Sequence, residues 1–390
     1  MIALAPTDRF HRILVICTRQ IGDVLLTTPL IHAAKRRWPE AQVDVLGFSG
    51  TLVLLRGNPQ VNELIEVLPG SGWLQSLTLI RRLWLHYDLA LIAQYSDRAH
   101  LYGALAARRR SGLVLKDRST SWWKPLLLEH AVVVDDDQTH AVLEKLRLIA
   151  PWAVPQVEVR VQPPPARELP AGVARQLRAR YVVIQVPTIV HYKQWPLVHH
   201  RALVRGLLAD GLQVVLSGGP SAADRAKTAQ VARSVGAAED GQLLDLAGAL
   251  DLNQMTALLR GAALCIGPDT SITHLAAACG TPVIAIYGLI DPRLWGPWPQ
   301  SHAAVQPYLE RALRQQHATI TLLQGELPCV PCNQQGCERH NDSRSDCLET
   351  LLPQRVLDEA RAKLNPPQAT ADAAALSLPL VRSRLTNAPT

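Results

Sequence analysis

The segment RILVICTRQIGDVLLTTPLIHAAKRRWPEAQVDVLG, Arg12–Gly47, decides the fold class. Its first part, Arg12–Thr18, is a short, continuous apolar run rich in β-branched residues, which is typical of a strand buried on both faces of a parallel sheet. A helical pattern follows over about Asp23–Trp38, and Gln42–Gly47 has the pattern of a second strand. A strand, a helix and a strand in this order predict a doubly wound α/β sheet.

The same alternation continues towards the C-terminus and is interrupted once. Strands are predicted at Asn62–Leu68 and Leu89–Gln94, with a helix at Leu74–Leu85 between them. The stretch QPPPARELP, Gln162–Pro170, contains four prolines and cannot form a helix or a central strand. It therefore separates two domains, over residues 1–165 and 166–365, and a chain of 390 residues is long enough for each to have its own core.

The second domain repeats the pattern of the first. Its strands are predicted at Tyr181–Gln185, Gln213–Ser217, Ala263–Gly267 and Pro282–Tyr287. Its helices are predicted at about Pro196–Asp210, Ala222–Val235, Leu252–Gly261, Ser271–Cys279 and Pro353–Leu364. Residues 366–390 are rich in Ala, Pro, Ser and Thr and are predicted to be disordered. Since ligands of such sheets bind beyond the carboxyl ends of the strands, we expect the functional residues just after strands, in a cleft between the domains.

The composition excludes some classes of protein. A net charge of +7 indicates an acidic partner, such as nucleic acid, anionic lipid or a phosphorylated sugar. The chain has only two Phe and no aromatic pattern of an RNA-binding module, so nucleic acid is not expected. No run reaches the roughly 18 apolar residues of a membrane-spanning helix. The N-terminus lacks the apolar core of a secretory signal, so a cytoplasmic location is expected.

Two polar segments follow strands of the two halves. In QIGD, Gln20–Asp23, a single glycine rules out the dinucleotide-binding fingerprint. Asp23 either caps the following helix or acts as a general base that faces the cleft. In PTIVHYKQWP, Pro187–Pro196, Thr188 offers a hydroxyl group. Lys193 either neutralises the charge on a departing diphosphate or is a solvated lysine ahead of a helix.

Two further segments lie after strands of the second half. GPDTSITH, Gly267–His274, places free backbone N–H groups at the start of a helix, which is a favourable site for an anion. Because Asp269 repels phosphate, we expect it to face sugar hydroxyls. In the alternative interpretation the segment only caps the helix, with Thr270 or Ser271 at the N-cap position and His274 buried. In SGGPSAAD, Ser217–Asp224, the glycines permit close approach of a ligand, and Asp224 either accepts hydrogen bonds from ribose hydroxyls or caps its helix.

Four cysteines form a cluster with the spacing Cys329-x2-Cys332-x4-Cys337-x9-Cys347. Four thiolates at short spacing can hold a structural zinc ion. The spacing lacks the paired CxxC form, and a reduced cluster without a ligand is the other interpretation. We predict no metal here.

Taken together, these motifs resemble glycosyltransferase family 9, the lipopolysaccharide heptosyltransferases. The resemblance covers roughly Arg12–Leu364 and rests on the segment quoted first, on KQWP, and on DTSITHLAAACGTPVIAIYG. The cysteine segment and SDCLETLLPQRVLDEARAKL are most similar to the heptosyltransferase III branch. Ser271-Ile272-Thr273 and Pro187-Thr188 depart from the pattern common in the family, which bears on the identity of the sugar.

The resemblance implies a GT-B fold, in which two Rossmann-like doubly wound parallel-sheet domains face each other across a cleft. Residues 1–165 would bind the acceptor and residues 166–365 the donor ADP-heptose, and the helix Pro353–Leu364 would cross back onto the first domain. The reaction would be an inverting transfer of heptose to the inner core of lipopolysaccharide in one displacement. It would need no cofactor and no metal.

The resemblance also assigns roles to single residues. Asp23 matches the base, which favours that role over the cap, and Lys193 matches the phosphate-binding lysine. Asp269 matches the residue that binds heptose hydroxyls. Among the other substrate-binding residues, Thr270, Ser271, Ile272 and His274 match the phosphate-facing loop. Asp224 and Leu250 match the ribose and adenine contacts. Gly22 and Thr188, which lie beside the motifs, complete the set.

The implied acceptor is a lipid-linked core oligosaccharide at the inner face of the inner membrane. Arg108–Arg110, with Trp122, Trp123 and Lys124, would either contact that membrane peripherally or form a solvated helix end with two core tryptophans. Two other functions are open: a GT-B transferase that uses another nucleotide sugar for O-antigen or another glycan, and a non-catalytic protein that binds sugar nucleotides. Because the chain keeps both Asp23 and Lys193, an enzyme is favoured.

Overall fold

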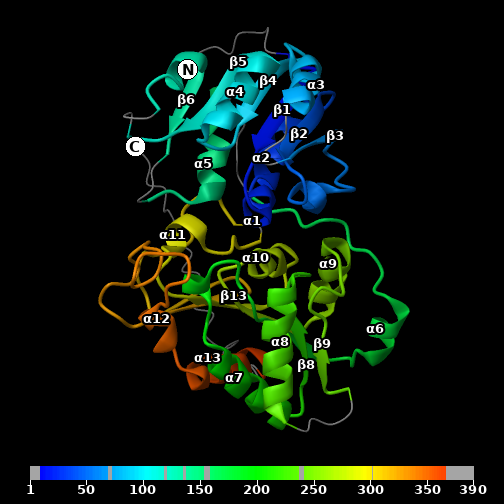
Figure 1. Ribbon diagram of the computed structural model, residues 1–390, viewed down its shortest axis with the longest axis vertical. Coiled ribbons are helices and arrows are strands. Elements are labelled where there is room, and N and C mark those ends of the chain that lie inside the picture. The colour runs from blue at the N-terminus through cyan, green and yellow to red at the C-terminus, as the bar shows by residue number, and fades with distance from the viewer. Residues whose placement is uncertain are drawn as a thin grey trace, which may run out of the picture.

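The computed structural model describes residues 9–68, 73–117, 121–134, 138–152, 159–236, 241–300 and 302–365. They form two α/β domains, the first at the top of Figure 1 and the second below it. The tail 366–390, predicted to be disordered, lies outside the described residues.

The first domain is built on a parallel sheet in the order β3-β2-β1-β4-β5-β6. Its strands are β1 (Arg12–Cys17), β2 (Gln42–Phe48), β3 (Glu63–Val67), β4 (Tyr87–Ile92), β5 (Ala107–Val114) and β6 (His130–Val133). Its helices are α1 (Ile21–Leu25), α2 (Thr28–Arg37), α3 (Trp73–Leu83), α4 (Asp97–Ala106) and α5 (Ala141–Arg147), with the 3-10 turns η1 (Leu52–Leu55), η2 (Pro125–Leu127) and η3 (Ala150–Trp152).

The second domain has a sheet in the order β12-β13-β11-β10-β7-β8-β9, parallel except for the β12–β13 pair. Its strands are β7 (Tyr181–Gln185), β8 (Gln213–Ser217), β9 (Leu243–Asp245), β10 (Leu264–Pro268), β11 (Val283–Tyr287), β12 (Arg314–His317) and β13 (Ile320–Gln324). Its helices are α6 (Ala171–Gln176), α7 (Leu197–Ala209), α8 (Ala222–Val235), α9 (Leu252–Gly261), α10 (Ser271–Ala278), α11 (Pro292–Trp295), α12 (Asp346–Glu349) and α13 (Pro353–Leu364), with the 3-10 turn η4 (His191–Lys193).

The apolar strands are buried on both faces, as the continuous runs predict. In β1, Leu14 and Ile16 point into the core beneath α3 and α4, whereas Ile13 and Val15 point into the core beneath α2 and α5. The second of these cores continues without interruption into the other domain and includes Val183 of β7. Each core strand therefore fixes its position by packing on two layers of helices.

The helix predicted over Asp23–Trp38 is wrong in one respect, because it is two helices, α1 and α2. Pro29 causes the break: it has no N–H to donate to the carbonyl of Leu25, and its ring would clash with that carbonyl in a continuous helix. The Thr28 hydroxyl donates to the Leu25 carbonyl instead, at 2.7 Å, and the Thr27 hydroxyl donates to the Asp23 carbonyl at 2.7 Å.

The expectation that the last helix crosses back onto the first domain is also wrong. α13 packs against α7 and lies over β10 and β11 of its own domain, at the bottom of Figure 1. Its buried residues, Val356, Leu357, Ala360 and Leu364, all join the core of the second domain. Arg361 adds an ion pair with Asp210 at the end of α7, at 2.7 Å.

Arg108–Arg110 lie in β5, so the interpretation of this segment as a helix end is wrong. The three arginines stand at the start of the strand, where their side chains reach neighbouring loops. Arg109 forms an ion pair with Glu129 at 2.6 Å, and Arg110 donates to the carbonyls of Ala107, at 2.7 Å, and Leu127. Because these charged side chains find partners at the start of β5, the strand does not need a continuous apolar run, and the apolar pattern therefore did not predict it.

The carboxyl ends of the two sheets face each other. α1, which follows β1, contacts α10, which follows β10 (Figure 1). His140 donates through Nε2 to the carbonyl of Gly296 at 2.8 Å, and Trp298 donates to the carbonyl of Val159 at 2.9 Å, so both sides of the boundary are joined. No helix within the described ranges has the length and apolar character needed to cross a membrane.

Candidate active site

Asp269 is the centre of the candidate site. It follows β10 directly, and only 9% of its side chain is exposed. Oδ2 lies 2.5 Å from the Lys193 ammonium, and Oδ1 lies 3.3 Å from His274 Nε2 and 3.2 Å from the donating hydroxyl of Tyr287. Residues 76 positions apart in the chain are thus joined by an ion pair at the edge where the strands end.

The electrostatics of this group favour a charged pair. Burial alone would raise the pKa of Asp269, but the Lys193 charge and the hydrogen bond from His274 outweigh it and lower that pKa below the ordinary 3.8. Burial opposes the charge of Lys193 as well, yet Asp269 raises the pKa of Lys193 above 10.5. The pair therefore stabilises the fold at neutral pH, and this contribution is lost only in acid below 3.8 or in base above 10.5.

The segment before α7 holds Lys193 in place. Trp195 is completely buried and donates from Nε1 to the Leu351 carbonyl at 2.9 Å. The Gln194 amide donates to the carbonyls of Val186 and Trp195, and its oxygen accepts from the backbone N–H of Thr188 at 3.3 Å. These contacts fix the backbone that follows Lys193, at the end of η4, and its ammonium group reaches Asp269.

The turn that starts α10 has the features of an anion site. Thr270 is at the N-cap position, as the capping alternative predicts, but its side chain makes no capping hydrogen bond. Thr273 donates its hydroxyl to the Pro268 carbonyl at 2.6 Å, and His274 is buried. α10 contacts α1 of the first domain, and its first backbone N–H groups, at Ser271 and Ile272, have no side-chain cap at Thr270.

Asp23 lies across the boundary from this turn. It is in the first turn of α1, whose N-cap is Gln20, so Asp23 does not cap the helix. Its carboxylate is 12% exposed and lies 3.7 Å from Arg19 Nε. Gly22 faces Ser271 of α10, because a side-chain carbon at position 22 would lie in van der Waals contact with it, at 3.9 Å. The charge of Asp23 is close enough to contribute to the raised pKa of Lys193.

The remaining predicted residues lie around the second sheet. Thr188 is buried and donates its hydroxyl to the Val190 carbonyl at 2.7 Å. Asp224 does not cap α8, because Ser221 does so by accepting from the Asp224 N–H at 3.0 Å. A side-chain carbon on Gly219 would lie 2.5 Å from the Asp224 carboxylate, so that glycine makes room for it. Leu250 is half-buried and packs against the shared core.

Sequence reasoning missed four residues of this site. Tyr287 ends β11 and bridges Asp269 and the Trp295 carbonyl, to which it donates at 2.8 Å. Burial and the neighbouring carboxylate raise the pKa of Tyr287 well above 10.0, so its hydroxyl remains a donor. Arg19 and Lys145 approach the ring of Trp295. The rule that sites follow strand ends could have found Arg19 and Tyr287, but nothing local marks the other two.

The four cysteines of the cluster, all among the described residues, are not arranged to hold a metal ion together. Cys329 and Cys337 are exposed, Cys332 is half-buried and Cys347 is buried, and all four are free. Among the residues that the structure describes, no three His, Cys, Asp or Glu side chains are arranged to hold a metal ion. Burial is the main cause that raises the pKa of the Cys347 thiol to about 12, and the three other thiols add to it.

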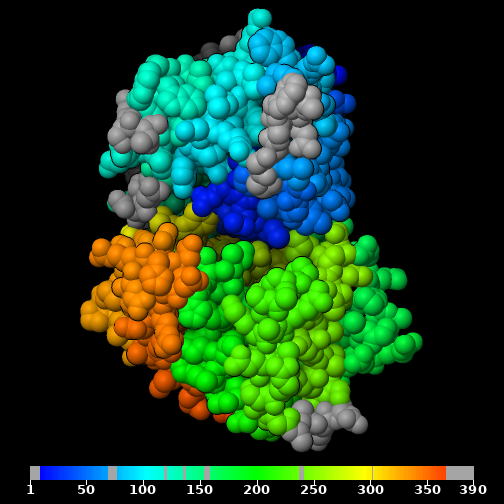
Figure 2. Space-filling model, viewed as in Figure 1, coloured from blue at the N-terminus to red at the C-terminus, as the bar shows by residue number. Residues whose placement is uncertain are grey.

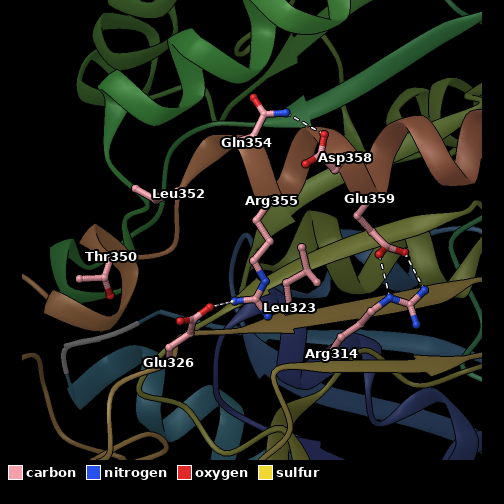
Figure 3. A pocket seen from close by; sticks show the side chains of 9 residues that line it. All are labelled: Arg314, Leu323, Glu326, Thr350, Leu352, Gln354, Arg355, Asp358 and Glu359. Atoms are coloured by element: carbon pink, nitrogen blue, oxygen red, sulfur yellow. Dashed lines mark hydrogen bonds and ion pairs between the residues drawn. The ribbon is translucent and has the colours of Figure 1, made fainter.

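A separate cavity of 620 Å³ lies on the second domain, beside α13 and β12, and Figure 3 shows its lining. Its charges pair with one another, Arg314 with Glu359 at 2.7 Å and Arg355 with Glu326 at 3.2 Å. None of the predicted site residues lines it. In Figure 2 the contact between the first and second domains runs across the middle of the molecule, above this region.

Comparison with known proteins identifies relatives of the chain. The model of glycosyltransferase family 9 (heptosyltransferase) matches residues 76–323. Lipopolysaccharide heptosyltransferase 3 of Escherichia coli K12 is 31% identical over 297 residues, which cover 73% of this chain and 84% of that protein. Lipopolysaccharide heptosyltransferase 2 of Salmonella typhimurium is 28% identical and covers 72% of this chain and 84% of that protein.

Solved structures confirm the predicted fold. The structure of E. coli ADP-heptose lps heptosyltransferase II matches with a TM-score of 0.67 at 22% identity, over 90% of this chain and 98% of that chain. The GT-B architecture of two parallel-sheet domains is therefore confirmed.

We predict that Lys193→Met lowers the free energy of unfolding by about 3 kcal/mol, because it leaves the Asp269 carboxylate buried without its cation. The same variant should bind ADP weakly in a calorimetric titration. The double variant Lys193→Met with Asp269→Asn removes the unpaired charge, so it should regain most of the stability but none of the ADP affinity. Unchanged stability of the single variant, or restored ADP binding in the double variant, would contradict this account of the pair.

Proposed function

The chain belongs to glycosyltransferase family 9 and is a glycosyltransferase, and we propose that it transfers heptose from ADP-heptose to the inner core of lipopolysaccharide. The names of its relatives support this donor and this acceptor. The single observation that carries the proposal is the buried Lys193–Asp269 pair facing Asp23 across the boundary between the domains.

The reaction assigned to this geometry is one displacement at the anomeric carbon. Asp23 takes the proton of the acceptor hydroxyl while that oxygen bonds to the anomeric carbon. The bond from this carbon to the diphosphate oxygen breaks, and its electron pair leaves with ADP. Because the attacking and leaving oxygens lie on opposite sides, the configuration of the sugar is inverted.

The second domain supplies the donor contacts in this proposal. Lys193 and the free N–H groups at Ser271 and Ile272 stabilise the charge that develops on the leaving diphosphate. Asp269 accepts hydrogen bonds from heptose hydroxyls, and its pairing with Lys193 keeps it from repelling the phosphates. Asp224 and Leu250 serve the ribose and the adenine, Thr188 lies beside the segment that carries Lys193, and His274 lies beside Asp269. The charge is neutralised by protein groups, so the proposal requires no metal ion.

The experiment that tests the donor measures nucleotide release. ADP-heptose, UDP-N-acetylglucosamine and UDP-glucose would each be offered with and without truncated lipopolysaccharide that carries inner-core heptose. We expect release of ADP that depends on the acceptor, and no release of UDP. Release of UDP alone would assign another nucleotide sugar, and no turnover with any donor would favour a non-catalytic binding protein.

We predict that Asp23→Asn lowers the rate of transfer by at least about 100-fold, because the amide cannot accept the proton. Its stability should be nearly unchanged, since Asp23 caps no helix and a 3.7 Å ion pair with Arg19 contributes little. Asp210→Asn, at the far end of α7, is the matched control and should keep the native rate. A rate for Asp23→Asn within a few-fold of native would remove Asp23 from the mechanism.

We also propose that the enzyme works at the cytoplasmic face of the membrane that anchors its acceptor. The surface that supports this is the segment after β5, where Trp122 is 64% and Leu126 75% exposed. On α4, Leu101 is 53% exposed. Trp123 in the same loop packs against His100 of α4, and Arg98 and Lys116 nearby are exposed. Lys124 is excluded from such a contact, because it is buried and forms an ion pair with Asp97 at 2.7 Å.

The membrane contact predicts binding to vesicles that contain anionic lipid, weakening as salt increases. Replacing both Trp122 and Leu126 by Ser should reduce sedimentation with these vesicles several-fold. Leu352→Ser removes a similarly exposed side chain from the second domain and should have no effect. Equal binding by all three proteins would show that the loop does not face the membrane.

A further inference from the structure

A second lysine, Lys227, points at the segment that carries Lys193, and the site described above gives it no role. It is half-buried on α8, and its ammonium nitrogen lies 3.2 Å from Gln194 Oε1 and 3.5 Å from the Thr188 carbonyl oxygen. Both acceptors are uncharged. Among the residues that the structure describes, no carboxylate forms an ion pair with Lys227, whereas Lys193 is paired with Asp269. Lys227 therefore keeps an unbalanced positive charge beside this segment.

Two contacts orient the ammonium group of Lys227 without using all of its hydrogen atoms. Gln194 accepts from both Lys227 and the backbone N–H of Thr188, and it donates to two carbonyls, so its own capacity is fully used. A side-chain carbon on Gly218 would lie 3.0 Å from Pro187, so the loops after β8 and β7 meet beside this contact. An ammonium group has three N–H donors, and two of them point at protein acceptors. One N–H remains for a ligand.

The order of the strands places this charge along a donor molecule. Adjacent strands run β10-β7-β8-β9, and the proposed contacts follow them in that order: Asp269 after β10, Lys193 after β7, Asp224 after β8 and Leu250 after β9. A sugar nucleotide has its parts in the same order, from the sugar through the β- and α-phosphates to the ribose and the base. Lys227 and Asp224 are neighbours on the surface of α8, because they stand three residues apart. Lys227 thus adjoins the ribose contact on one side and the segment of Lys193 on the other.

We propose that Lys227 binds the α-phosphate of the donor nucleotide, whereas Lys193 binds the β-phosphate that leaves the sugar. The α-phosphate is attached to the ribose, so it is the phosphate that lies beside a cation next to the ribose contact. Because Asp269 balances the charge of Lys193, Lys227 supplies the net positive charge that attracts the diphosphate. This inference rests on the proposed function and deepens it, since it divides the diphosphate between two lysines.

Calorimetric titration with adenosine, AMP and ADP tests this division without turnover. We expect Lys227→Met to lower the affinities for AMP and ADP about tenfold or more, because it removes a hydrogen bond between charged groups. Its affinity for adenosine should equal that of the native protein. Lys193→Met should weaken the binding of ADP but not of AMP. The matched control is Lys363→Met, which removes another half-buried lysine that donates to a carbonyl, that of Thr319, and should change none of the three affinities.

Two further variants separate the charge of Lys227 from its support of the neighbouring segment. Lys227→Gln can still donate to the Thr188 carbonyl but has no charge, so it should lose AMP affinity as Lys227→Met does. Lys227→Arg keeps the charge and should retain most of the AMP affinity. Native AMP affinity in Lys227→Gln would overturn the proposal. So would an equal loss of adenosine, AMP and ADP affinity in Lys227→Met, because that result assigns the lysine a purely structural role.

Steady-state kinetics distinguishes the two lysines independently. Negative charge develops on the β-phosphate oxygen as its bond to the anomeric carbon breaks, whereas the charge of the α-phosphate does not change. Lys227→Met should therefore raise KM for ADP-heptose and leave kcat nearly unchanged, because it removes binding that is equal in the ground state and the transition state. Lys193→Met should lower kcat. A kcat for Lys227→Met as low as that of Lys193→Met would overturn the division between the phosphates.

Failure of this inference and failure of the proposed function give different results. Loss of AMP affinity in Lys227→Met, together with no release of ADP in the donor panel, would refute heptose transfer and leave the phosphate contact intact. Native affinities for AMP and ADP in Lys227→Met, together with release of ADP that depends on the acceptor, would refute the phosphate contact alone.

Discussion

The ion pair between Lys193 and Asp269 is the interaction on which the site depends. A carboxylate that is 9% exposed would be costly on its own, and so would the lysine, but together they form a stable charged pair at the ends of β7 and β10. Tyr287 and His274 complete the coordination of the carboxylate, and Trp195 anchors the segment that delivers Lys193. The interior of the fold thus contains a polar cluster at a position that apolar side chains would fill in a purely structural core.

The contact between α1 and α10 brings Asp23 of the first domain opposite this cluster. Both helices follow central strands, so packing the carboxyl ends of two parallel sheets against each other brings their first turns together. Gly22 faces Ser271 across this contact, and an apolar core shared by both domains packs around it. Asp23 and Asp269 are therefore positioned by the same central strands that make the sheets, which couples the geometry of the site to the most deeply buried part of the fold.

The sequence predicted those parts of the structure that depend on local patterns. β7, β8, α8, α9 and α13 begin and end at the predicted residues, because continuous apolar runs and amphipathic periods report burial directly. β5 does not follow from the apolar pattern because three arginines come directly after its first residue. The break between α1 and α2 does not follow from the helical period, which continues across Pro29. The motif residues were found as separate candidates. Their pairing was not predictable, because Lys193 and Asp269 meet only through the order of strands in the sheet.

The charged groups on the two sides of the domain boundary serve different parts of the proposed reaction. On the second domain the lysine and the aspartate cancel, so a diphosphate meets one mobile cation and the dipoles of backbone N–H groups. On the first domain the carboxylate of Asp23 lies 3.7 Å from Arg19 Nε, and the Arg19 guanidinium also approaches the ring of Trp295 in the second domain. In the proposed reaction the second domain therefore stabilises the leaving group, while the first domain supplies the group that takes the proton, and the contact of α1 with α10 holds these two parts together.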